Sequence, residues 1–163
     1  MMYWFFGIPG SGKSHLAGLF SQMTGIQVYE GDDFHTEDDR RAVAEGTFTL
    51  EHRYAQLERI NATLQATRMP NALVTHPLPD RTSRALVRKM SDGAVRLIYV
   101  TAPLPLIKER LRTRTGHHFG PDLLDAWVPR HWEEPKDEDC FVIENGSNGH
   151  SIEALLRKLC SDR

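Results

Sequence analysis

A short glycine-rich motif near the start of the chain constrains the fold more than any other feature. Residues 7–14 read Gly7-Ile8-Pro9-Gly10-Ser11-Gly12-Lys13-Ser14 and satisfy the pattern GxxxxGK followed by Ser or Thr. A loop of this kind points its backbone N–H groups at a phosphate, and the helix after it adds its positive end. The motif predicts a nucleotide-binding P-loop in which Lys13 reaches the β- and γ-phosphates and the Ser14 hydroxyl holds Mg²⁺.

The residues on either side of the motif supply the strand and the helix that a P-loop needs. Residues 3–6 are a short aromatic run, which is typical of a buried strand. Between residues 14 and 23 the apolar side chains recur at helical spacing, at Leu16, Leu19, Phe20 and Met23. Strand, loop and helix follow without a gap, which disfavours the alternative of a glycine turn that binds nothing.

The rest of the chain alternates between strand and helix patterns. Further strands are expected at residues 26–29, 71–75, 95–100 and 140–143, and helices at residues 36–45, 50–68, 80–90, 105–114 and 151–160. This alternation predicts a three-layer α/β/α P-loop NTPase fold with a five-stranded parallel sheet. Ligands bind such sheets at the carboxyl ends of the strands, so the residues that follow each strand should face one cleft.

Residues 116–135 interrupt this alternation. The segment is rich in His, Gly, Pro and Trp, and only residues 122–127 look helical. Long loops in compact domains are usually functional. We therefore expect a loop insertion that acts as a lid, approximately over residues 115–135, within a single domain spanning residues 1–163.

Composition narrows the classes of partner. The 20 Lys and Arg residues against 22 Asp and Glu residues give a formal net charge of −2, so no basic face for nucleic acid is expected. Cys140 and Cys160 lack CxxC spacing and suit reduced thiols of a cytoplasmic protein. No apolar run approaches the ~20 residues of a membrane span. The expected partner is a small molecule rather than nucleic acid or a membrane.

Two carboxylates follow the second expected strand. Glu30 and Asp32 lie two residues apart, so both can point toward the γ-phosphate. One would hold Mg²⁺ through water, and the other would take the proton from an attacking hydroxyl group. The alternative is that Asp32 and Asp33 only cap the next helix.

Arginines suit the negative charge that spreads over a phosphoryl group during transfer. Arg110 and Arg114 lie one helical turn apart just before the lid, where they could close over ATP. Arg81 and Arg84 lie three residues apart on the helix after the third strand, where they could grip an anionic acceptor. For each of these residues the alternative is a solvated helix face.

With these residues identified, the chain resembles the gluconate kinase family, within the shikimate-kinase-like group of small P-loop kinases. Residues 7–14 match its GxPGSGKS loop, and residues 30–35 match its DGDDFH segment with Glu in place of the first Asp. Residues 80–88 are similar to its KRSYRDxLR segment, and residues 110–124 are similar to its lid pattern RLxxRxGHFxPxxLL.

The resemblance implies phosphorylation of a hydroxyl group on a sugar acid such as gluconate, with ATP and Mg²⁺ as cofactors. We expect a monomer or homodimer. Asp32 falls where such kinases bind and deprotonate the acceptor, Glu30 falls near the metal, and Arg114 falls on the lid arginine. The acceptor contacts implied on this chain are Asp32, His35, Arg81, Arg84 and His117.

The departures from the family pattern lie in the acceptor half. Thr36, Asp39 and the pair Ala42-Val43 replace its proline, asparagine and Lys-Met pair, and His76-Pro77 replaces a cysteine-serine pair. The sequence therefore leaves the acceptor open: shikimate, a nucleoside monophosphate or an antibiotic are alternatives. A further alternative is a catalytically silent regulatory protein that binds ATP without transferring phosphate.

Overall fold

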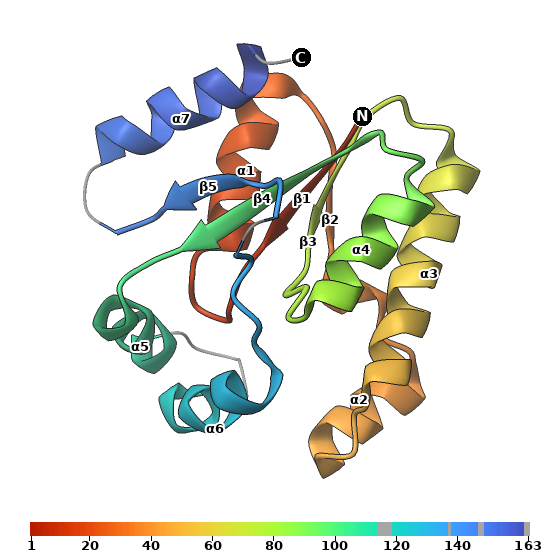
Figure 1. Ribbon diagram of the computed structural model, residues 1–163, viewed down its shortest axis with the longest axis vertical. Coiled ribbons are helices and arrows are strands. Elements are labelled where there is room, and N and C mark those ends of the chain that lie inside the picture. The colour runs from red at the N-terminus through yellow and green to blue at the C-terminus, as the bar shows by residue number, and fades with distance from the viewer. Residues whose placement is uncertain (114–118, 137, 147–148, 162–163) are drawn as a thin grey trace.

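The computed structural model describes residues 1–113, 119–136, 138–146 and 149–161. Within them lies one parallel sheet with the strand order β2-β3-β1-β4-β5 (Figure 1). The strands are β1 Met2–Phe6, β2 Val28–Glu30, β3 Ala72–Thr75, β4 Val95–Thr101 and β5 Phe141–Glu144. The predicted α/β architecture is confirmed.

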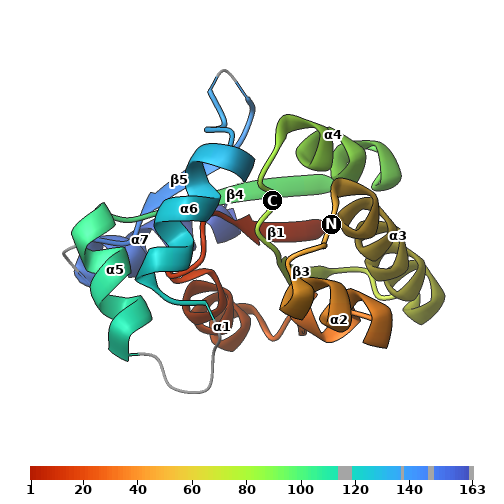
Figure 2. The same cartoon turned by 90° about the horizontal axis from the view of Figure 1, so that it is seen from below.

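Helices cover both faces of the sheet. They are α1 Lys13–Thr24, α2 Glu37–Glu45, α3 Leu50–Thr67, α4 Arg81–Met90, α5 Leu104–Thr113, α6 Pro121–His131 and α7 Gly149–Ser161, with a 3₁₀ turn, η1, at Gly31–Phe34. Apolar side chains of α1 and α7 pack on one face, and those of α3 and α4 pack on the other. Figure 2 shows α1 and α4 on opposite sides of the strands.

The aromatic run at the start of the chain forms the central strand. Tyr3 and Phe5 pack toward α1, whereas Trp4 and Phe6 pack toward α3 and α4. All four are at most 1% exposed. A strand buried on both faces needs apolar residues at every position, which explains the continuous run. This position in the sheet places the P-loop at the middle of its carboxyl edge.

The predicted start and end of α2 are confirmed. Thr36 caps the helix: its hydroxyl accepts from the backbone N–H of Asp39, and its own N–H donates to the Asp39 carboxylate. Gly46 ends α2 in the left-handed conformation with φ 70°. Because Thr36 takes the capping role, Asp32 and Asp33 do not cap this helix and lie in η1 instead.

The expectation of a loop over residues 115–135 is wrong for residues 121–131, which are helical, whereas a lid role for this segment stays a prediction. Residues 121–131 form the continuous helix α6, although only residues 122–127 looked helical and Pro129 lies inside it. Leu124 and Val128 of α6 pack against α5, and this burial outweighs the hydrogen bond that a proline removes. Figure 1 places α5 and α6 together beyond the carboxyl end of β4.

No helix in the described ranges is long and apolar enough to cross a membrane.

Candidate active site

Three glycines shape the P-loop between β1 and α1. Gly7, Gly10 and Gly12 have φ angles of 148°, 84° and 100°, which residues with a Cβ rarely adopt. A Cβ atom at Gly7 would also collide with the carbonyl oxygen of Val100, and one at Gly12 with the Nδ2 atom of Asn145. The loop therefore lies directly against β4 and the end of β5.

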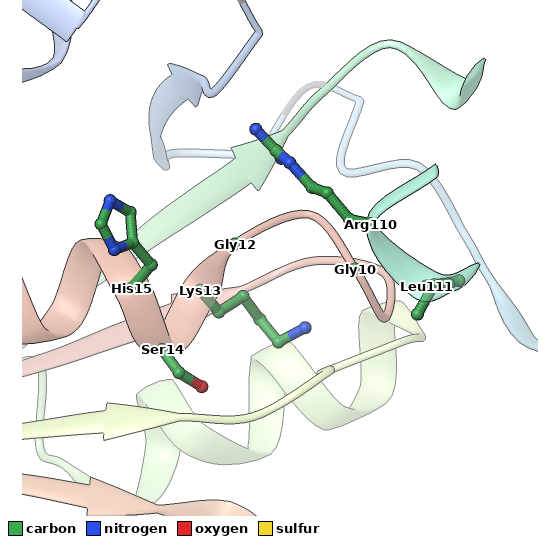
Figure 3. A pocket seen from close by; sticks show the side chains of 7 residues that line it. All are labelled: Gly10, Gly12, Lys13, Ser14, His15, Arg110 and Leu111. Carbon is green, nitrogen blue, oxygen red and sulfur yellow. The ribbon is translucent and has the colours of Figure 1, made fainter. Parts of the chain in front are cut away.

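A cavity of about 260 Å³ opens at this loop. It is lined by Gly10, Gly12, Lys13, Ser14, His15, Arg110 and Leu111. Figure 3 shows the side chains of Lys13 and Ser14 on one side of the loop and those of His15 and Arg110 on the other. Lys13 Nζ donates to the carbonyl oxygen of Ile8 over 3.0 Å. An ammonium group and the N-terminus of α1 thus face the same space, which suits a chain of phosphates.

The two residues predicted to serve the metal lie together. Ser14 Oγ donates to Glu30 Oε2 over 2.9 Å, and Thr75 Oγ1 donates to the same oxygen. One hydroxyl and one carboxylate fit a Mg²⁺ ion that keeps most of its ligands from phosphate and water. No group of three His, Cys, Asp or Glu residues that could hold a metal occurs in the described part of the chain.

Arg110 binds backbone atoms of the P-loop and of the turn after β5. Its Nη1 atom donates to the Ser11 carbonyl oxygen over 3.2 Å, and its Nη2 atom donates to the Asn145 carbonyl oxygen over 2.9 Å. The buried Asn145 side chain also donates to Ser11, over 2.8 Å. Arg110 and Asn145 therefore hold the loop in place, while a role for Arg110 at the transferring phosphoryl group stays a prediction. Arg114 and His117 lie outside the described residues.

A partly buried arginine that was not predicted lies near the acidic turn. The guanidinium group of Arg53 lies over the ring of Phe48, 5.4 Å from its centroid. Its buried Nε atom has no hydrogen-bond partner within the described residues. Burial lowers the pKa of Arg53, against the opposing charges of Asp80 and Asp32. A partly desolvated cation favours an anionic partner.

The sequence did contain a signal for Arg53. Arg53, Leu57, Ile60 and Leu64 follow one another at spacings of four, three and four residues, so they share one face of α3. The three apolar members are at most 3% exposed. An arginine on a buried stripe is directed toward the interior rather than toward solvent.

His35, a predicted acceptor contact, lies close to the same group. Its ring meets the ring of Phe48 edge-on, with centroids 5.6 Å apart. Burial lowers the pKa of His35, the charges of Asp32 and Asp39 raise it, and that of Arg53 lowers it further. Asp32 is exposed in η1. The structure thus brings Asp32, His35 and Arg53 within electrostatic range of one another.

The prediction that Arg84 grips the acceptor is wrong. Arg84 is 1% exposed, and its guanidinium group donates to both carboxylate oxygens of Glu138 and to the carbonyl oxygen of Leu78. It also lies over the Phe6 ring, 5.7 Å from the centroid. Its donors are used inside the protein, so Arg84 is structural. Arg81 is exposed at the start of α4, and its role at the acceptor stays a prediction.

Comparison with known proteins agrees with this geometry. The family model described as "AAA domain" matches residues 2–128. A protein named "Probable gluconokinase" from Mus musculus is 27% identical over 139 residues, which is 74% of this chain and 76% of that protein. Another "Probable gluconokinase", from Schizosaccharomyces pombe, is 23% identical over 160 residues, or 91% of this chain and 83% of that protein.

A solved structure extends the similarity to the whole fold. The crystal structure of a gluconokinase from Sinorhizobium meliloti 1021 superposes with a TM-score of 0.81 at 24% identity, covering 99% of this chain and 94% of that chain. The resemblance to gluconate kinases expected from the motifs is confirmed, as is the P-loop kinase fold.

Proposed function

The chain belongs to the AAA-domain family, and from this premise we propose that it is an ATP-dependent kinase that phosphorylates a hydroxyl group of a small sugar acid. The observation that carries the proposal is the hydrogen bond from Ser14 to Glu30. It joins the P-loop to the strand end that precedes Asp32 by two residues. A phosphate site and a candidate base therefore lie at one edge of the sheet.

The nucleotide side of the site consists of the P-loop and its supports. The backbone N–H groups of residues 7–14 and the ammonium group of Lys13 would bind the ATP phosphates. Ser14 and, through water, Glu30 would hold Mg²⁺. A bound Mg²⁺ would neutralise charge on the phosphates. Arg110 keeps the loop against Asn145, so the phosphate-binding groups are organised before ATP arrives.

Asp32 is the proposed base on the acceptor side. The acceptor hydroxyl oxygen forms a bond to the γ-phosphorus, the bond from that phosphorus to the β–γ bridging oxygen breaks, and ADP leaves. The hydroxyl proton passes to the Asp32 carboxylate. Most of the rate enhancement in such transfers comes from positioning and charge neutralisation, and the base adds to it.

The partly buried position of Arg53 favours an acceptor that carries a negative charge. The Arg53 guanidinium group is partly desolvated and acts electrostatically on His35 near the Asp32 turn. A carboxylate would accept charge-assisted hydrogen bonds from it. A sugar acid supplies this carboxylate together with the hydroxyl groups that Asp32 needs. We place the enzyme in the cytoplasm, as a monomer or homodimer.

A panel of acceptors tests the proposal. ADP release would be measured with gluconate, with glucitol, which differs from it by a CH₂OH group in place of the carboxylate, and with shikimate, a nucleoside monophosphate and an aminoglycoside. We expect turnover with gluconate or a related sugar acid and much less with glucitol. ATP binding by calorimetry without ADP release for any acceptor would instead establish the regulatory alternative.

A further inference from the structure

A buried histidine follows β3 on the acceptor side of the sheet. His76 is 2% exposed, its backbone N–H donates to the carbonyl oxygen of Phe5 over 3.1 Å, and its ring lies edge-on to Trp4. It stands where the gluconate kinase pattern has a cysteine, so this chain has its own arrangement at the end of β3. The steps described above for phosphate transfer do not use His76.

The hydrogen bonds of His76 determine which of its nitrogens carries the proton. The backbone N–H of Leu78 donates to His76 Nδ1 over 3.1 Å, so Nδ1 must be unprotonated. A neutral imidazole then has its proton on Nε2. His76 Nε2 lies 3.1 Å from Gln56 Oε1, so the ring donates to this amide oxygen.

The Gln56 amide connects His76 to the acidic turn by a further hydrogen bond. Gln56 is 1% exposed, and with its oxygen accepting from His76, its Nε2 atom donates to the carbonyl oxygen of Gly31 over 2.7 Å. The result is a chain of three bonds with one consistent direction, from Leu78 through His76 and Gln56 to Gly31. We call His76 and Gln56 the relay.

Gly31 is the first residue of η1, and Asp32 follows it. A Cβ atom on Gly31 would lie 2.6 Å from the carbonyl oxygen of Thr75 and 2.9 Å from Cδ2 of His76. The start of the turn is therefore packed directly against the end of β3. Glu30, the residue before Gly31, accepts from Ser14 and Thr75, so the residue that leads into the turn is also attached.

The same helix also holds the far end of the turn. Arg59, three residues after Gln56 on α3, donates from Nε to the carbonyl oxygen of Phe34 over 3.2 Å. Both ends of η1 are thus attached to α3, while Asp32 between them is exposed. An exposed carboxylate on a turn fixed at both ends has a defined position without being buried.

We propose that His76 and Gln56 are positioning residues, which hold the Gly31 carbonyl so that Asp32 stays in place to take the acceptor proton. The proposal rests on the proposed function for its effect on catalysis. Its structural part, that the relay orders η1, is independent of the acceptor.

Two substitutions at one site separate positioning from general core stability. His76→Gln keeps a donor near the position of Nε2 and so keeps the bond to Gln56, whereas His76→Asn keeps an acceptor near Nδ1 and so keeps the bond from Leu78. Each variant loses one of the two bonds. A merely structural histidine would give both variants similar kinetics.

The kinetic test compares these variants with Gln56→Met, which removes both relay bonds from α3. We expect kcat to fall about 10- to 100-fold in H76N and Q56M, with the KM for ATP unchanged, and to stay within about threefold of wild type in H76Q. Leu64→Ala, which weakens the same helix away from the turn, should leave kcat unchanged at a temperature where it is folded. Equal kcat values in H76Q and H76N would overturn the proposal.

Amide hydrogen exchange tests the structural part without any acceptor. Exchange at residues 31–35 should be faster in H76N and Q56M than in the wild type, and unchanged in H76Q. If the wild type phosphorylates none of the acceptors, the proposed function is wrong. Hydrogen exchange alone then tests whether the relay orders η1. Unchanged exchange at residues 31–35 in Q56M would overturn it.

Discussion

Ser14, in the first turn of α1, donates a hydrogen bond of 2.9 Å to Glu30, the last residue of β2. Ser14 follows β1 through the P-loop, and Glu30 ends β2. The ends of β1 and β2 are not adjacent, because β3 lies between these strands in the sheet. Thr75 of β3 bridges them by donating to the same carboxylate oxygen. The P-loop and the acidic turn therefore form one connected unit.

Replacing Lys13 by Ala should reduce turnover by at least about 100-fold, because an ammonium group at the phosphates is lost. The helix α1 begins at this residue and Ala is a good helix former, so the fold should be retained. ADP release and circular dichroism measure the two effects. Full activity in a folded variant would contradict the assignment of the P-loop.

Asp32→Asn should lower kcat about 10²- to 10⁴-fold and change ATP affinity little, since general-base catalysis contributes in this range. Asp33→Asn is the matched control, because Asp33 is also exposed and lies in the same turn. Steady-state kinetics with ATP binding by calorimetry separate the effects. Loss of ATP affinity equal to the loss of kcat would make Asp32 a structural residue.

Arg53→Met should raise the KM for a sugar acid about 10- to 100-fold, which corresponds to a lost charge-assisted hydrogen bond. Its melting temperature should not fall, because the substitution removes a partly desolvated cation and keeps an apolar stem beside Phe48. Initial rates with gluconate and glucitol, together with a thermal melt, measure this. A similar loss for both acceptors would show that Arg53 does not bind the carboxylate.

Breaking the buried pair of Arg84 and Glu138 should cost about 3–5 kcal/mol of unfolding free energy, because one charge stays buried without its partner. Glu138→Gln would be compared in urea denaturation with the double variant Arg84→Met/Glu138→Gln, which removes both charges and should recover part of the loss. The KM for the acceptor should be unchanged in the folded variants. A selective rise of this KM would restore Arg84 as an acceptor ligand.

Stability should fall as the pH drops below about 6.5. Burial lowers the pKa of His76 well below its usual value, and the positive charges of Arg53 on α3, His35 after η1 and Lys13 on α1 add to this. The unfolded chain then binds a proton that folded His76 does not, so unfolding becomes easier by up to about 1.4 kcal/mol per pH unit. His35 and His131, whose pKa values burial also lowers, act in the same direction.

His76→Gln isolates this contribution. Urea unfolding between about pH 7 and pH 5 should show a smaller loss of stability in H76Q than in the wild type. Identical pH dependence in the two proteins would mean that His76 accepts a proton in the folded state.

Local patterns of the sequence were sufficient for much of this site. The P-loop, the alternation of strands and helices and the cap of α2 at Thr36 each depend on residues that are near one another in the chain. The prediction of a loop failed at α6. Pro129 disfavours a helix locally, but the packing of Leu124 against α5 outweighs this effect. Burial against another element cannot be read from a short window of sequence.

By itself the sequence determined a parallel α/β fold with a phosphate loop at the centre of its sheet, because glycine conformations and side-chain periodicity act over a few residues. Tertiary contacts were needed to show that Arg84 pairs with Glu138, 54 residues away, and that His76 and Gln56 hold the turn. An arginine on a helix looks the same in sequence whether it meets solvent, a carboxylate or a ligand. Which of these it meets depends on the elements that fold against it.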